Sequence, residues 1–409
     1  MIEISQEQAQ NFILEKQGLR TKSPSKSIMD VVRRIHNIQI DTISVVARSH
    51  DLTLFNRLPN YQEKEVWKYI KDRKLFEYWS HARCLIPIED YSFYAWKMEY
   101  LEDNISNWWN KWVVGNKQMI NDVYKYIKKN GTACSADFKR EEGKESQGWW
   151  DWTDEKRAME YLFRIGKLMI DYRKGFQRYY DLTERVLPPS IDNEPMVKDE
   201  LPYFMVNTIF SSIGLGNFEE MRFYLGASHV KFLWNNKREK ITQFLDECIK
   251  EGILESVQVE GIDSIHFVLS KEANKLVNES DDLSKQPLKF LSPFDNLIRE
   301  RNYPSKIWKF DYKLEAFTPE KQRIYGYYVL PILDNNKLIG RADIKAHRKD
   351  CLLEIKALYL EDKPIDDSFI DRFHSGLKLF ADFHNCNSLK INRISPASLK
   401  NRIPQSLDD

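Results

Sequence analysis

The spacing of apolar residues near the start of the chain predicts a short amphipathic helix. Ser27 is a candidate N-cap, because a serine hydroxyl can accept a hydrogen bond from the first turn of a helix. Apolar side chains then recur at helical spacing at Ile28, Val31, Val32 and Ile35. This helix leads the chain directly into a segment with a different pattern.

Residues 37–42, with the sequence Asn-Ile-Gln-Ile-Asp-Thr, alternate polar and apolar side chains. In an extended segment, Ile38 and Ile40 would enter the core, and Gln39 and Asp41 would project together from the opposite face. A water held beside a negative charge can hydrolyse a bond whose leaving group is activated. Gln39 and Asp41 are therefore candidate catalytic residues. The alternative is that they are solvated surface groups or cap a turn.

Two later parts of the chain share one order of elements: a helix, a glycine, a strand, a turn and a second strand. The first copy has a helical stripe up to Ile165, Gly166 as a left-handed cap, and strands at 168–172 and 176–180 around the basic turn 173–175. An extended, aromatic-rich segment at 75–82 precedes it.

The second copy repeats each step, with a helix over 241–249, Gly252, and strands at 253–259 and 265–268. Helix followed by hairpin is the second half of a winged helix. Such modules bind DNA in many proteins and serve as docking or scaffold modules in others.

The last third of the chain has the pattern of short strands. Strands are predicted at 325–333, 337–346 and 351–360, joined by polar turns, which suggests a meander or a small barrel. A final helix is predicted at about 369–385.

Composition excludes several classes of protein. The chain has 409 residues, enough for two to four domains, and 42% of them are hydrophobic, with no apolar stretch of membrane-spanning length. The amino terminus lacks the features of a secretory signal, so a cytoplasmic location is expected. Five scattered cysteines without a C-x-x-C pair predict packed, reduced thiols and no structural zinc. Because 62 basic residues oppose 61 acidic ones, any nucleic-acid surface must be local.

Several blocks resemble the YcaQ-like family of winged-helix DNA glycosylases, which unhook interstrand crosslinks. The resemblance spans nearly the whole chain. It is carried by residues 39–43 (Gln-Ile-Asp-Thr-Ile), 76–81 (Phe-Glu-Tyr-Trp-Ser-His), 148–152 (Gly-Trp-Trp-Asp-Trp), 179–188, 291–295 (Leu-Ser-Pro-Phe-Asp), 325–331 and 340–343.

The resemblance implies an α+β fold with three tandem winged-helix modules, braced by a C-terminal β-barrel-like domain. The implied boundaries are residues 1–105, 106–195 and 196–285 for the modules, and 286–409 for the last domain with its C-terminal helix. The catalytic pair would lie on the first module. Family members carry Gln-x-Gln or Gln-x-Asp there, and this chain resembles the second branch, which is associated with crosslinks and simpler N7-alkylpurine adducts.

The expected activity is hydrolysis of the N-glycosidic bond of N7-alkylated purines, with unhooking of crosslinks, by a monofunctional enzyme without metal or other cofactor. An N7-alkylated guanine is cationic and departs readily, so Asp41 is expected to stabilise the oxocarbenium-like sugar and accept a proton from the water that Gln39 holds. The pair contains no lysine, which predicts no Schiff base and an abasic-site product. The expected partner is damaged double-stranded DNA, bound by a monomer.

Further site candidates follow from charge and position. His81, beside Trp79, is expected either to support Asp41 or to be a packed structural residue. Six basic residues are candidate DNA contacts, and each is equally compatible with a solvated surface charge: Arg33, Arg34, Arg48, Arg173, Lys174 and Arg178.

Two other functions remain open from the sequence. A non-catalytic winged-helix regulator or scaffold would bind DNA without using Gln39 or Asp41. A magnesium-dependent nuclease would use an acidic-x-Lys strand, at 343–345 or 354–356, together with another carboxylate such as Asp295.

Overall fold

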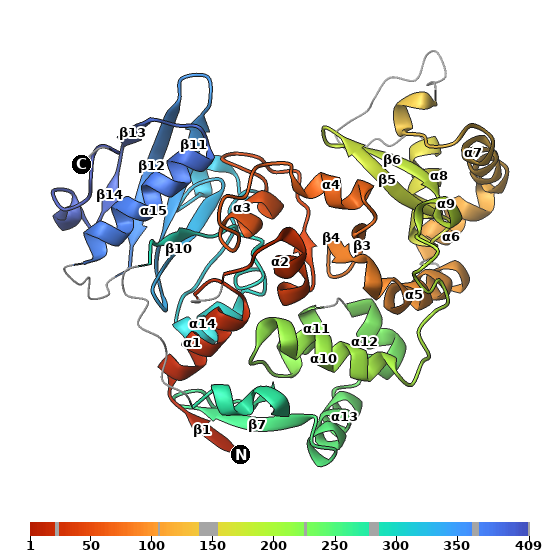
Figure 1. Ribbon diagram of the computed structural model, residues 1–409, viewed down its shortest axis with the longest axis horizontal. Helices are drawn as coiled ribbons and strands as arrows, with labels where there is room; N and C mark the ends of the chain where they lie inside the picture. Colours follow the sequence, from red (N-terminus) through yellow and green to blue (C-terminus); the bar gives the residue numbers. More distant parts are fainter. Residues whose placement is uncertain are drawn as a thin grey trace. The chain divides into compact units, whose positions relative to one another are not determined.

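The computed structural model describes the chain except for residues 21–23, 105–106, 139–153, 225–226, 278–285, 362–367 and 408–409 (Figure 1). It divides into two compact units. Unit 1 contains Met1–Glu63 and Met205–Asp409, and unit 2 contains Lys64–Phe204. In sequence, unit 2 is therefore an insertion within unit 1.

Unit 1 combines short helices with two sheets. Its helices are α1 (Gln6–Lys16), α2 (Ile28–Ile35), α3 (Ser49–Phe55), α11 (Phe218–Tyr224), α12 (Ala227–Trp234), α13 (Arg238–Lys250), α14 (Asn302–Trp308) and α15 (Phe369–Phe383), and the boundary between the units falls within α10 (Leu201–Ile213). Its strands are β1 (Ile2–Ile4), β2 (Ile38–Gln39), β7 (Leu254–Val259), β8 (His266–Leu269), β9 (Lys289–Phe290), β10 (Val329–Asp334), β11 (Lys337–His347), β12 (Leu352–Leu360), β13 (Ser388–Ile391) and β14 (Ile394–Ser395).

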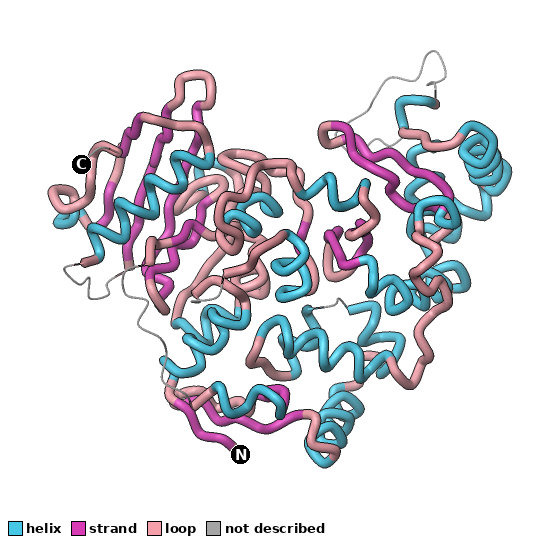
Figure 2. Tube along the Cα trace, viewed as in Figure 1, coloured by secondary structure: helices cyan, strands magenta, loops and turns pink. Residues whose placement is uncertain are grey.

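The larger sheet of unit 1 has the strand order β13-β12-β11-β10-β9, with β14 also beside β12. Strands β9 to β12 are antiparallel neighbours, whereas β13 and β14 run parallel to β12. Helix α15 lies against this sheet (Figure 2). Its Phe373, Leu377 and Phe380 belong to the same core as Leu330 and Ile355 of the sheet. The predicted meander and final helix are confirmed. Within the described residues, no strand pairing closes this sheet into a barrel, so the barrel-like part of the prediction is not confirmed.

The smaller sheet of unit 1 joins the start of the chain to a segment far along the sequence. Strand β1 pairs in parallel with β7, Ile2 opposite Val257, and β7 pairs with β8 in an antiparallel hairpin. Phe12 of α1 and Trp308 of α14 belong to the core cluster that contains Val257. The amino terminus is thus held by residues more than half the chain away.

Unit 2 consists of helices around two hairpins. Its elements are α4 (Val66–Lys71), β3 (Leu75–Trp79), β4 (Arg83–Pro87), α5 (Tyr91–Asp103), α6 (Asn107–Gly115), α7 (Lys117–Asn130), α8 (Asp154–Arg164), β5 (Leu168–Lys174), β6 (Gln177–Leu182) and α9 (Thr183–Val186). Tyr78 of β3 packs its ring 5.5 Å from that of Phe163 on α8, which in turn lies 5.9 Å from Tyr180 on β6. These aromatic contacts join the two hairpins across α8.

Both predicted helix–glycine–hairpin orders are confirmed. Gly166 follows α8 with φ 73°, and Gly252 follows α13 with φ 72°, the left-handed conformation that glycine adopts without strain. The mixed α and β architecture is therefore as predicted. The number of winged-helix modules and their boundaries stay predictions, and the block 148–152 lies outside the described residues.

Two predictions from composition can also be compared with the structure. All five cysteines are free thiols, buried except for the half-buried Cys351, as predicted. Among the described helices, none combines the length and the apolar character needed to cross a bilayer.

Candidate active site

The candidate catalytic pair follows α2 as the sequence predicts. Ser27 caps the helix, because its hydroxyl accepts a hydrogen bond from the Asp30 N–H at 3.1 Å. Beyond the helix, Ile38 and Ile40 are buried, whereas Gln39 and Asp41 are half-buried, so the predicted alternation is present. The strand β2 itself ends at Gln39, which places Asp41 in the turn that follows.

Three side chains from later in unit 1 hold the backbone just before this pair. The Tyr224 hydroxyl donates to the Ile35 carbonyl at 2.5 Å. The Asn296 amide donates to the same carbonyl at 3.0 Å and to that of Asn37 at 3.1 Å, and Arg299 donates to the Asn37 side-chain oxygen at 2.6 Å. All five of these residues are buried. They fix the backbone that enters Gln39, so the site is built on a rigid support.

The segment that carries Asn296 and Arg299 is itself held by a buried ion pair. Arg57 donates two hydrogen bonds to Asp295, at 2.6 and 2.8 Å, and a third to the Gln17 carbonyl at 2.7 Å. Asp295 also accepts the Leu297 N–H at 3.0 Å. Both partner side chains of the ion pair are 0% exposed. Arg57 thus engages both of the carboxylate oxygens that the nuclease alternative would give to a metal ion, and the geometry offers that alternative no support.

Asp41 occupies an environment that shifts its protonation. Burial raises the pKa of its carboxyl group, against the opposing effects of the Ile43 N–H, the positive charge of Arg48 and the Thr42 N–H. The hydrogen bond from the Ile43 N–H, at 2.7 Å, is an Asx turn, the local capping role that the sequence left open. A carboxylate can accept further hydrogen bonds through its remaining lone pairs, so this turn orients Asp41 and leaves the carboxylate able to accept a hydrogen bond from a water molecule.

Tyr328 adds a buried hydroxyl to this region. Burial raises its pKa strongly, and the negative charge of Asp41 contributes to the increase, which places the two groups within electrostatic range. The Tyr328 hydroxyl lies 3.3 Å from that of Ser292, which donates to the Ser49 hydroxyl at 3.0 Å. Tyr328 lies in the block 325–331 that carries the resemblance, but no local pattern marks it as a site residue.

Three of the candidate DNA contacts lie close to the pair in sequence. Arg33 is exposed and Arg34 is half-buried, and both lie in the last turn of α2, where positive charge is favourable to the helix dipole. Arg48 is half-buried at the start of α3 and acts electrostatically on Asp41.

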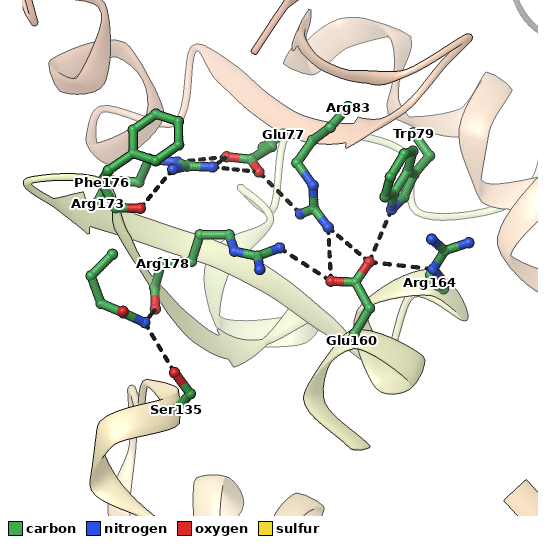
Figure 3. A network of polar contacts seen from close by, with 10 residues as sticks. Glu77, Trp79, Arg83, Ser135, Glu160, Arg164, Arg173, Phe176 and Arg178 are labelled. Carbon is green, nitrogen blue, oxygen red and sulfur yellow. Dashed lines mark hydrogen bonds and ion pairs between the residues drawn. The ribbon is translucent and has the colours of Figure 1, made fainter. Parts of the chain in front are cut away.

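The other candidates lie in unit 2, where Arg173 and Arg178 belong to a network of charged side chains around two buried carboxylates (Figure 3). Glu77 accepts hydrogen bonds from Arg173 at 2.7 and 2.8 Å and from Arg83 at 3.0 Å. The Arg173 side chain is only 2% exposed, so its guanidinium group serves Glu77 in this structure. Lys174, next to it in the turn, is exposed.

Glu160 is the second carboxylate of this network. It accepts hydrogen bonds from Arg83 at 2.7 Å, Arg178 at 3.1 Å, Arg164 at 3.3 Å and the Trp79 indole at 3.1 Å. Burial acts to raise its pKa, but the guanidinium charges outweigh burial and lower the pKa to about 2. Glu160 therefore stays ionised and holds four side chains together.

Trp79 and His81, the predicted supporting residues, belong to the β3–β4 hairpin of unit 2. Trp79 lies between two guanidinium groups, 4.9 Å from Arg83 and 4.5 Å from Arg164, and its carbonyl accepts a hydrogen bond from the buried Lys97 at 2.8 Å. His81 is half-buried. Because the candidate catalytic pair belongs to unit 1, support of Asp41 by either residue stays a prediction.

No metal centre is apparent in the described part of the chain, where His, Cys, Asp and Glu side chains nowhere gather in threes. Gln39 lies two residues before Asp41, and Arg48 and Tyr328 interact with Asp41 electrostatically. An amide, an arginine and a phenol are suited to binding water or anions.

The family model described as DNA glycosylase AlkZ-like matches residues 32–382. The chain belongs to this family. The match begins within α2 and so includes Gln39, Asp41 and the anchoring residues of unit 1.

The fold of this AlkZ-like chain is similar to that of a solved structure, Streptomyces sahachiroi DNA glycosylase AlkZ. The TM-score is 0.64 at 15% sequence identity, and the match covers 96% of this chain and 100% of the other. At this identity the comparison supports the shared fold. The resemblance that the sequence blocks indicated is confirmed by the family match.

The AlkZ-like chain contains site residues that sequence reasoning missed. Tyr224, Asn296, Arg299 and Tyr328 all act on or near the 35–41 segment through contacts that span large distances in sequence. One signal was present: residues 292–299, Ser-Pro-Phe-Asp-Asn-Leu-Ile-Arg, mix polar and apolar side chains in a way that surface loops seldom require.

Proposed function

We propose that this protein is a monofunctional, metal-independent DNA glycosylase that hydrolyses the N-glycosidic bond of N7-alkylated purines and unhooks interstrand crosslinks. The observation that carries the proposal is the half-buried pair Gln39 and Asp41 at the end of an anchored strand. Family membership supplies the reaction class, and the pair supplies groups suited to it.

The chemistry needs little from the enzyme on the purine side. Alkylation at N7 makes the base cationic, so it leaves without a strong general acid, and positive charge develops on the sugar. The Asp41 carboxylate stabilises this charge and accepts the proton of the attacking water. Gln39 offers a donor and an acceptor that fix the water.

The environment of Asp41 suits both of its tasks. Partial burial strengthens its electrostatic effect on the sugar, and its raised pKa makes it a better proton acceptor. The Ile43 N–H keeps the carboxylate in one orientation. The base-release rate should fall as pH decreases through the raised pKa of Asp41, because only the ionised form acts.

Binding of damaged duplex DNA is assigned to Arg33, Arg34, Arg48, Arg173, Lys174 and Arg178. Among them, Arg33 and Lys174 are exposed and suited to phosphate contacts, whereas Arg173 is engaged by Glu77 and is expected to act by shaping the hairpin. We expect the protein to act as a monomer.

The test measures base release in the presence of EDTA. Wild type, Asp41→Asn and Gln39→Ala are incubated with a duplex containing N7-methylguanine, and alkali then converts abasic sites to strand breaks. Each variant should lose at least about tenfold in single-turnover rate, equivalent to about 1.4 kcal/mol of barrier. Thr42→Ala is the matched control, because Thr42 is exposed between the same elements.

A second substrate tests the finer part of the proposal, which is the unhooking of interstrand crosslinks. A nitrogen-mustard crosslinked duplex should be resolved into single strands by wild type and not by Asp41→Asn. Equal rates for wild type and both variants would remove the pair from the mechanism. DNA binding without release of any base would favour the non-catalytic regulator.

A further inference from the structure

Among the described residues, two of the most exposed large apolar side chains lie on one loop of unit 1. Phe317 is 85% exposed and Ile324 is 71% exposed, and only the terminal Met1 falls between them. We call residues 315–327 the apolar loop. Single exposed apolar residues are common, but two on one short loop leave more apolar surface in water than either would alone.

A buried carboxylate closes the apolar loop. Glu315, 4% exposed, accepts the backbone N–H groups of Ile324, Tyr325 and Gly326 at 3.0, 2.8 and 3.2 Å. Burial acts to raise the pKa of Glu315, but these three donors outweigh burial and lower it. An ionised group at the base of the loop therefore ties its two ends together.

A second link lies further along the same loop. The Arg323 guanidinium donates to the Thr318 carbonyl at 2.9 Å and lies 5.0 Å from the Tyr327 ring. With the loop closed by Glu315 and by the Arg323–Thr318 hydrogen bond, the backbone holds Phe317 and Ile324 outward. Their exposure is thus a property of a constrained loop.

The apolar loop and the candidate active site rest on the same hydrophobic core. Leu314, just before it, and Tyr327, at its end, pack against the same core cluster as Ile43 and Val45, which follow Asp41. The next residue is Tyr328, on which the charge of Asp41 acts. The loop and the catalytic pair therefore share one rigid base within unit 1.

The charges around the loop nearly balance. The exposed Lys313 and Lys321 and the half-buried Arg323 are opposed by the exposed Asp311 and Glu320 and by the ionised Glu315. An apolar tip without net charge suits the bases of nucleic acid, which stack on apolar side chains, rather than its phosphates.

We propose that the apolar loop places Phe317, supported by Ile324, against the base stack of duplex DNA beside the lesion. This proposal rests on the proposed glycosylase function and names the part of the DNA that the same site holds. Local separation of bases exposes a glycosidic bond, and an apolar side chain can occupy the gap that separation opens.

The experiment measures binding and unstacking separately from base release. A duplex with 2-aminopurine beside an abasic-site analogue reports unstacking by fluorescence and affinity by anisotropy. Wild type should increase 2-aminopurine fluorescence. Phe317→Ala should lose most of that increase and about tenfold in affinity, the scale expected for one lost stacking contact.

Matched variants make the result specific. Phe317→Tyr keeps the ring and should behave as wild type, and Leu379→Ala removes an exposed apolar side chain from α15 and should do the same. Glu315→Gln should reduce the fluorescence increase, because the loop loses the charge that ties its ends.

The outcomes also separate this proposal from the proposed function. Asp41→Asn should bind and unstack the duplex as wild type does, so a failure of the catalytic assignment leaves this test readable. Wild-type binding and fluorescence in the double variant Phe317→Ala, Ile324→Ala would overturn the proposal. A changed sedimentation coefficient of that double variant, with DNA binding intact, would also overturn it, because the loop would then contact another protein molecule instead of DNA.

Discussion

Replacement of Glu160 by glutamine should destabilise unit 2 far more than a single surface charge would. The Glu160 carboxylate holds Arg83, Arg164, Arg178 and the Trp79 indole. A glutamine side chain has nearly the same shape but no charge, and its amide hydrogens would face guanidinium groups.

The magnitude follows from the shift in acidity. The pKa of Glu160 falls from 4.5 to about 2 in the folded protein. At about 1.4 kcal/mol for each pKa unit, the ionised carboxylate contributes about 3 kcal/mol to the free energy of unfolding. This agrees with the roughly 3–5 kcal/mol lost when one member of a buried ion pair is removed.

The pH dependence has a defined sign. Because folding depresses this pKa, the stabilisation is complete above pH 4.5 and is lost as pH falls towards about 2. The difference between wild type and Glu160→Gln should therefore be about 3 kcal/mol at pH 7 and should shrink steadily below pH 4.5.

Urea unfolding followed by tryptophan fluorescence at pH 7 and pH 3, with amide hydrogen exchange of unit 2 peptides at pH 7, measures this. The control is Glu102→Gln, which breaks an exposed pair with Lys167 whose Nζ–Oε2 distance is 3.2 Å. Such pairs are worth less than about 1 kcal/mol. Equal losses in the two variants, or a difference that persists unchanged at low pH, would refute the reasoning.

Two further predictions concern the candidate active site. Asp41→Asn should raise the free energy of unfolding at neutral pH while abolishing base release. Burial raises the pKa of Asp41, so its ionised form opposes folding as pH rises. Chemical denaturation at pH 7 measures the change, and a loss of stability would contradict the prediction. Asn296→Ala should lower the single-turnover rate about tenfold or more with little change in DNA affinity. The substitution frees the backbone at Asn37 without removing an exposed side chain. The rate of base release and the fluorescence anisotropy of bound DNA, measured together, test this, and a pure loss of affinity would argue against a positioning role.

The parts of the fold that the sequence predicts are those set by neighbouring residues. The cap at Ser27, the alternation of Ile38 and Ile40, and the glycine after each helix depend on local geometry, and all are found in the structure. The barrel-like closure depended on pairings between distant strands, and no periodicity in one segment reports such a pairing.

The candidate site divides along the same line. Gln39 and Asp41 could be selected because alternation puts them on one face. Arg173 could only be read as a basic turn residue, because the carboxylate that buries it, Glu77, lies 96 residues earlier. Asn296 lies in the unusual segment 292–299, but its anchoring role could not be predicted, since its two carbonyl partners lie 259 and 261 residues away in the sequence.

The pairing of β1 with β7 has a consequence for biosynthesis. Ile2 cannot pair with Val257, and Asn37 cannot form its hydrogen bonds with Asn296 and Arg299, until those residues have left the ribosome. At about 5–20 residues per second, that delay is on the order of ten seconds to a minute. The inserted Lys64–Phe204 unit emerges complete during this interval. A nascent or truncated chain would thus contain all of the inserted unit but not yet the partners of Ile2 and Asn37, so the segment that carries the proposed catalytic pair is anchored only after residue 299 has been made.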